Sequence, residues 1–312
     1  MRFDKFEKKI IKGLRKIYGG NAEIGTGVVM KNNGSKYNGV HIMMKDSECR
    51  TAPVVDLDSI YEAFERGKKN LEGCILDVYH QREALKSPEG IEQLAEKSKD
   101  WERVKDKIYP ILLSTEENKE LLQNLVSRPL LDLSVAYVIR EDMSERCAAN
   151  IKISEGLLRY YGVDSEQLHE QAMKNLEGDG YEFQDLAGLV RKICQLEALE
   201  EELGIGDHGP EMYILTNESR SYGAAGILNR KILKEFAGDR DFLILPSSIH
   251  ETLFVPVNGE PDQEYFDTMV REINRTDVCV EERLADHSYY YDAAADEIRM
   301  CAGHGQRKEM NT

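Results

Sequence analysis

Ser247, Ser248, His250 and Glu251 are the residues whose types and spacing most resemble those of a hydrolytic site. They place hydroxyl, imidazole and carboxylate groups within five positions. A serine nucleophile needs a base within about 2.6–3.2 Å, and a third group must orient that base. Alternate residues of a strand share a face, so Ser248 and His250 could adjoin while Glu251 points away. The chain has no G-x-S-x-G elbow, and no second histidine follows four residues after His250. We favour the alternative, a turn whose serine hydroxyls bond to backbone amides.

Asp286 and His287 precede three consecutive tyrosines, at 289–291, and would join the serine group if folding brought the two stretches together. An imidazole beside a carboxylate can relay a proton. Aromatic side chains on a half-buried hairpin explain the same residues without chemistry, and we favour that interpretation. The candidate catalytic residues are therefore six side chains with no firm assigned role: Ser247, Ser248, His250, Glu251, Asp286 and His287.

A glycine-rich motif and six cysteines are the features that could indicate a cofactor or a metal site. Residues 204–209 spell G-x-G-x-x-G, but an acidic helix is expected before them and a strand after them. A dinucleotide site needs the opposite order, because the pyrophosphate must meet the amides that open a helix. The six cysteines are dispersed, with no C-x-x-C pair and no histidine at zinc-finger spacing. The sequence therefore predicts no cofactor and no metal ion.

The C-terminal two thirds of the chain must position the candidate residues. Strands are expected at 107–114, 130–140, 146–154, 211–217, 242–246 and 251–257, with a final hairpin through the tyrosines. Helices are expected at 116–126, 165–176, 182–203, 224–236 and 262–274. Residues 107–140 and 211–257 both run strand, polar turn, helix, strand, which suggests an internal repeat.

The N-terminal region begins with a helix that carries apolar residues from Phe3 to Ile17 on one face. A hairpin of strands 22–30 and 36–44 follows around an Asn-Gly turn, and Asp56 is suited to cap a further helix. The expected organisation is an N-terminal part (1–87), a connecting helix (88–106), an α+β domain (107–302) and a flexible tail (303–312). The fold class is α+β, with mixed, largely antiparallel sheets, packed helices and two lobes.

Charge limits the classes of partner. The chain has 57 acidic and 41 basic residues, a net charge of −16, which argues against a general nucleic-acid binder. Residues 1–16 are the exception, with seven basic and two acidic side chains. A basic amphipathic helix can lie on an anionic membrane or enter a partner's groove. We favour the alternative that this helix packs on its own domain with its lysines in water.

The compartment is expected to be the cytoplasm. Charges interrupt the apolar runs of the N-terminus before a signal-peptide core could form. No stretch approaches the roughly 20 apolar residues that a membrane span needs. Without a secretion route, six reduced thiols are the favoured interpretation of the cysteines.

Several stretches carry a family resemblance: KIYPILLST at 107–115, the strands around 131–152, SEQLHEQAMKNL, EMYILTN, YGAAGILNRKILKEF, DFLILPSSIHETLFVP and DHSYYYD. On these residues the chain resembles a bacterial family of uncharacterised proteins, a domain of unknown function. It is more distantly similar to another conserved hypothetical bacterial family, with the same tyrosine-proline strand and asparagine-leucine helix. The resemblance implies a cytosolic protein of mixed α/β architecture and brings no activity or catalytic residue. The distant family keeps no serine pair at 247–248, which counts against a shared serine mechanism.

Three functions follow as hypotheses. The first is a non-enzymatic interaction or regulatory protein whose acidic surface meets a protein partner. The second is a hydrolase or transferase with a site around Ser248 and His250. The third is attachment to a membrane surface through residues 1–17. The sequence specifies neither an oligomeric state nor a ligand.

Overall fold

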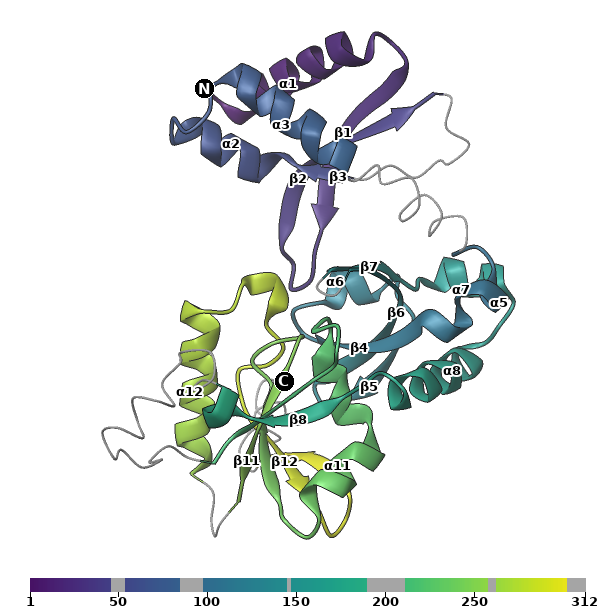
Figure 1. Ribbon diagram of the computed structural model, residues 1–312, viewed down its shortest axis with the longest axis vertical. Helices are drawn as coiled ribbons and strands as arrows, with labels where there is room; N and C mark the ends of the chain where they lie inside the picture. The colour runs from purple at the N-terminus through teal and green to yellow at the C-terminus, as the bar shows by residue number, and fades with distance from the viewer. Residues whose placement is uncertain (46–53, 85–97, 145–146, 190–210, 258–261, 302–312) are drawn as a thin grey trace, which may run out of the picture. The chain divides into compact units, whose positions relative to one another are not determined.

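The structure is a computed structural model that describes residues 1–45, 54–84, 98–144, 147–189, 211–257 and 262–301 (Figure 1). It divides into two compact units, Met1–Val104 and Lys105–Thr312. The predicted α+β class is confirmed, since helices accompany three sheets whose described strand pairs are all antiparallel. No helix among the described residues is both long and apolar enough to cross a bilayer.

The N-terminal unit is a three-stranded sheet with helices on one face (Figure 1). Its elements are α1 (Phe3–Tyr18), β1 (Ala22–Met30), β2 (Lys36–Met44), β3 (Val54–Asp56), α2 (Leu57–Glu65), α3 (Leu71–Ala84) and α5 (Trp101–Val104). The predicted hairpin is confirmed, because β1 pairs with β2 around Asn33 and Gly34, both at positive φ. Asp56 caps α2 as predicted, and its side chain accepts from the amides of Asp58 and Ser59.

The core of this unit explains why α1 forms a helix here. Phe6, Ile10 and Leu14 recur at four-residue spacing and are fully buried against Val40 and Ile42 of β2. Gly19 then ends the helix in the left-handed conformation, which a glycine adopts at little steric cost. The predicted packing of α1 on its own domain is therefore confirmed.

The first sheet of the C-terminal unit is organised by one long strand. Its elements are η1 (Lys105–Lys107), β4 (Ile108–Ser114), α6 (Lys119–Leu122), β5 (Ser127–Leu130), β6 (Leu133–Ser144), β7 (Cys147–Lys152), α7 (Glu155–Tyr161) and α8 (Ser165–Glu177). Strand β6 pairs with β4, β5 and β7. Helix α8 packs against β4, and Tyr137 of β6 bonds through its hydroxyl to His169 of α8 at 2.9 Å.

The second sheet has the order β13-β12-β10-β11-β9-β8. Its elements are β8 (Glu182–Asp185), β9 (Tyr213–Thr216), η2 (Gly223–Leu228), α11 (Arg230–Ala237), β10 (Phe242–Leu245), β11 (Thr252–Pro256), α12 (Gln263–Thr276), η3 (Val280–Glu282), β12 (Tyr289–Asp292) and β13 (Glu297–Met300). All four residues of β10 are buried, because α12 covers one face and an aromatic cluster around Phe236 of α11 covers the other.

Three predicted helices differ from the structure. The helix expected at 116–126 is only α6, because the chain turns into strand β5 at Ser127. Residues 182–185 form strand β8 on the edge of the second sheet, where a helix was expected; 190–203 lie outside the described residues. The helix expected at 224–236 breaks at Asn229 into a 3₁₀ turn and α11. Asn229 begins α11 as its N-cap, because its side chain accepts a hydrogen bond from the Ile232 amide.

Residues 85–97 of the predicted connecting helix, the tail from residue 302 and the glycine motif at 204–209 also lie outside the described residues. The two segments proposed as a repeat, residues 107–140 and 211–257, arrange their three strands in the same order. In each, the third strand lies between the first and second, as β4-β6-β5 and β9-β11-β10.

Candidate functional site

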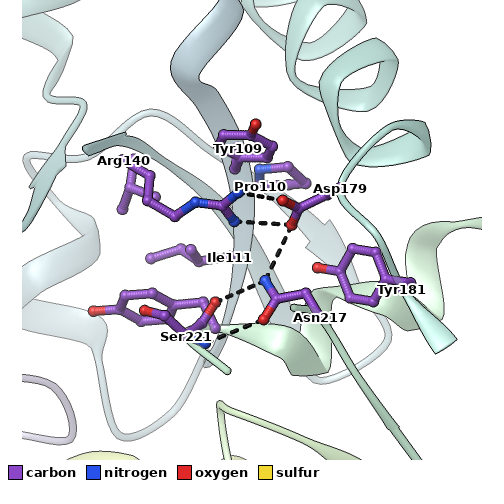
Figure 2. Close-up of a pocket in the computed structure, with 10 residues that line it drawn as sticks. Tyr109, Pro110, Ile111, Arg140, Asp179, Tyr181, Asn217 and Ser221 are labelled. Carbon is purple, nitrogen blue, oxygen red and sulfur yellow. Dashed lines mark hydrogen bonds and ion pairs between the residues drawn. The ribbon is translucent and has the colours of Figure 1, made fainter. Parts of the chain in front are cut away.

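A polar crevice lies where the two sheets of the C-terminal unit meet (Figure 2). Strands β4 and β6 contribute Tyr109 and Arg140, the segment after α8 contributes Asp179 and Tyr181, and the loop after β9 contributes Asn217. The side chains that line the crevice leave no cavity between them that is large enough for a water molecule. It is therefore a packed polar junction in this conformation.

The junction is built around an ion pair between Arg140 and Asp179. The guanidinium donates to both carboxylate oxygens, at 2.8 Å for the Nη1–Oδ2 pair, and the two side chains are only 7% and 6% exposed. The ring of Tyr109 lies under the guanidinium, 3.7 Å from its carbon. Asn217 adds a third hydrogen bond to Asp179, from Nδ2 to Oδ2 at 3.0 Å (Figure 2). Both Nη atoms of Arg140 are therefore already hydrogen-bonded to a carboxylate of the protein itself.

Tyr181 lies beside this pair with its phenol turned toward Asn217 (Figure 2). Burial first, and the charge of Asp179 second, raise the pKa of Tyr181 far above its usual range. The phenol therefore stays protonated at any physiological pH and does not act as a base.

Asn217 also shapes the loop that closes the crevice. Its Oδ1 accepts from the Ser221 amide at 3.1 Å, and its Nδ2 donates to the Ser221 carbonyl at 3.0 Å. Within this loop Arg220 and Tyr222 hold positive φ angles of 51° and 54°, which few residues other than glycine adopt. One amide side chain thus fixes a strained loop to the buried ion pair.

The serine–histidine stretch lies directly behind this loop, between β10 and β11. The Ser248 hydroxyl accepts a hydrogen bond from the backbone amide of His250 at 3.0 Å. The His250 ring accepts at Nδ1 from the backbone amide of Tyr222 at 3.2 Å, and its Nε2 lies 3.7 Å from a carboxylate oxygen of Glu282. A ring that accepts at Nδ1 carries its proton on Nε2, so its one lone pair is used by the loop.

The remaining candidates of this stretch have no catalytic geometry in the described residues. Ser247 is half-buried, and its carbonyl accepts from the Leu284 amide at 3.4 Å. Glu251 is half-buried at the start of the chain segment that enters β11. Neither side chain has a described hydrogen bond to the His250 ring.

Folding does bring the second candidate stretch alongside the first. The Ile249 amide donates to the Glu282 carbonyl at 2.8 Å, and the Ala285 amide donates to the Pro246 carbonyl at 3.0 Å. Asp286 follows immediately, but its carboxylate accepts from Asn274 of α12 at 2.6 Å. The backbones are therefore paired while the side chains point to different partners.

His287 belongs to a third cluster, centred on Asp132 in the turn between β5 and β6. Its Nε2 lies 2.9 Å from Asp132 and its Nδ1 lies 3.2 Å from the Ser288 carbonyl. The Tyr289 hydroxyl donates to the other Asp132 oxygen at 2.7 Å. This cluster joins the first sheet to the second.

The pKa values of this cluster follow from its contacts. Burial alone would lower the pKa of His287, but the bonds to Asp132 and Ser288 and the Asp132 charge outweigh it, so the pKa is raised. Burial opposes ionisation of Asp132 as well, yet the bonds from His287 and Tyr289 leave its pKa lowered. Each member of the pair thus favours the charged form of the other, and a protonated His287 donates from both ring nitrogens, to Asp132 and to the Ser288 carbonyl.

The six candidate residues thus fall into three sets of contacts, and they do not converge on one another. The residues that do converge, Arg140, Asp179 and Asn217, were missed by sequence reasoning. The signals were faint: an arginine directly after the apolar run of β6, an aspartate between two glycines and an asparagine directly after β9. Among the described residues no group of three or more His, Cys, Asp or Glu side chains could hold a metal ion.

Comparison with known proteins gives one match. The model of a family described as a "family of unknown function (DUF5688)" matches residues 3–293. No curated protein and no solved structure matches the chain.

Proposed function

Since the chain belongs to DUF5688, a family of unknown function, we propose from its own charges and geometry that it is a non-catalytic interaction protein. In this proposal the acidic C-terminal unit binds a cationic protein partner. The proposal rests on the difference in net charge between the two units. Residues 105–312 hold 22 basic and 40 acidic side chains, a net −18, whereas residues 1–104 hold 19 and 17, a net +2.

An acidic surface of this size favours encounter with a positively charged protein. Complementary charge raises association rates and disfavours partners of the wrong sign. Exposed acidic side chains are distributed over the described helices and turns of the unit, including Glu117, Glu170, Glu177, Glu235, Glu264, Glu272 and Asp277. Such carboxylates also keep a protein soluble, so binding needs a direct test.

The contacts of the candidate catalytic residues support binding over hydrolysis. A hydrolase would need the His250 lone pair to accept the serine proton, but that lone pair accepts the Tyr222 amide. The Ser248 hydroxyl is likewise engaged by the amide of His250. These hydrogen bonds close the turn after β10 and join it to the loop after β9, which is a structural role.

A cytoplasmic location forms part of the proposal. The thiols of Cys74 and Cys301 are free and buried, and burial raises the pKa of both. Buried, protonated thiols are unreactive and suit a reducing compartment.

The test is chemical cross-linking of the tagged full-length chain in cells, followed by capture at low and high salt. We expect a basic protein cross-linked to residues 105–301 and released as ionic strength rises from about 0.1 to 1 M, where the Debye length falls from about 10 to 3 Å. The variant Glu170→Gln/Glu177→Gln should weaken capture, whereas the control Lys231→Gln/Lys234→Gln should not. A partner that resists salt, or cross-links confined to the N-terminal unit, would contradict the proposal.

A further inference from the structure

Helix α1 presents a continuous basic face to solvent. Six cationic side chains on it are exposed: Lys5, Lys8, Lys9, Lys12, Arg15 and Lys16. Their spacing places them within one arc of the helix, opposite the buried row of Phe6, Ile10 and Leu14. From Lys5 to Lys16 the face extends about 16 Å, at about 1.5 Å per residue.

The packing of α1 decides how this face can be used. Its apolar residues are fully buried in the core of the N-terminal unit, so the helix cannot turn them toward a bilayer. The core instead holds the basic face outward in a fixed orientation. Any partner therefore meets ammonium and guanidinium groups on a fixed helix backbone, and binding does not pay the entropy of folding the helix.

We propose that this face of α1 binds the anionic headgroup surface of a lipid bilayer. The inference is independent of the protein partner proposed above, because it concerns the other unit. The composition of the face favours a bilayer over nucleic acid. The exposed face is mostly lysine and carries no amide or hydroxyl side chain that reads a base edge.

The expected strength follows from charge. Each lysine or arginine close to an anionic surface strengthens binding by about fivefold, which corresponds to about 1 kcal/mol. Removing three of the six charges should therefore weaken binding by about 100-fold. The anionic bilayer surface repels the C-terminal unit, because the net charge of that unit is −18. Attachment is thus peripheral, limited to α1 and sensitive to salt.

The test is co-sedimentation of the full-length chain with phosphatidylcholine vesicles that contain about one third phosphatidylserine. Wild type should bind these vesicles at low salt, release them at high salt and ignore pure phosphatidylcholine. The variant Lys8→Gln/Lys9→Gln/Lys12→Gln should lose about 100-fold in affinity. The matched control Lys68→Gln/Lys231→Gln/Lys234→Gln alters three exposed lysines elsewhere and should bind like wild type.

Circular dichroism of each variant verifies the fold, and Lys5→Gln/Arg15→Gln/Lys16→Gln gives a second set from the same face. Binding that is absent, or that both α1 variants leave unchanged, overturns the proposal. Tighter binding to duplex DNA than to the anionic vesicles at equal phosphate concentration also overturns it, and assigns the face to nucleic acid.

Discussion

Replacing Asp179 by alanine should destabilise the C-terminal unit severely, because the change leaves a buried guanidinium without its counter-ion. Arg140 is 7% exposed and donates to both oxygens of Asp179. The change therefore leaves the guanidinium without an anion in a site that solvent barely reaches, and the Asn217 amide loses an acceptor as well. Such a charge is costly to leave unpaired in a protein interior.

The magnitude follows from this burial. Removing one partner of a buried ion pair costs about 3–5 kcal/mol, and one kcal/mol shifts the melting temperature of a 150–250-residue domain by about 2–4 °C. The unfolding midpoint of Asp179→Ala should therefore fall by about 10 °C. Replacing both partners with apolar residues, as in Arg140→Met/Asp179→Leu, should recover most of the loss, because neither charge then remains buried.

The assays are thermal and urea denaturation of wild type, Asp179→Ala, Arg140→Met, Asp179→Leu and Arg140→Met/Asp179→Leu. Wild type and the last three variants form a double-mutant cycle. Hydrogen exchange of peptides from β6 and α8 assigns the loss to the C-terminal unit. Glu62→Ala serves as a control, since it breaks an exposed pair with Arg66 and should leave the midpoint unchanged. A loss below about 1 kcal/mol in Asp179→Ala, or a double variant as unstable as the sum of its singles, would refute the reasoning.

Three further predictions concern the neighbouring contacts. Because the pKa of His287 is raised, its pair with Asp132 stabilises the fold fully below about pH 6.5 and loses its effect as pH rises through the folded-state pKa. Asp132→Asn should therefore cost about 1–2 kcal/mol near pH 6 and less near pH 9 in paired melting curves. Gly223→Ala should cost about 1–3 kcal/mol by denaturation, since its Cβ would lie 2.3 Å from the His250 carbonyl, whereas Gly156→Ala has room and should not destabilise. Asn217→Asp should lower stability by about 3 kcal/mol, and by more than Asn217→Ala, because it adds a carboxylate beside the buried one; equal losses would contradict this.

The sequence predicted those elements of the fold that depend on interactions between residues close together in the chain. The apolar spacing of Phe6, Ile10 and Leu14 predicted both the helix and its buried face. The pair Asn33-Gly34 predicted a turn that needs positive φ, and Asp56 predicted a cap. Each depends on residues within a few positions of one another, which is the range over which sequence pattern is informative.

The crevice could not be predicted in this way, because its members meet only after the sheets have assembled. Arg140 and Asp179 are 39 positions apart, and Asp179 and Asn217 are 38 apart. His250 shows the same limit on a smaller scale. Its proximity to Ser248 is real, but the bond runs from its backbone amide, and the partner of its ring comes from another loop.

The central claim is that Ser248 and His250 make structural hydrogen bonds and have no catalytic role. Labelling of the intact chain with a serine-reactive fluorophosphonate tests this claim most directly. Because the His250 lone pair accepts the Tyr222 amide, no base activates the hydroxyl. We therefore expect mass spectrometry to show no label at Ser247 or Ser248 in the folded protein. Stoichiometric labelling of either serine that disappears in His250→Ala would contradict the structural role and restore the hydrolase hypothesis.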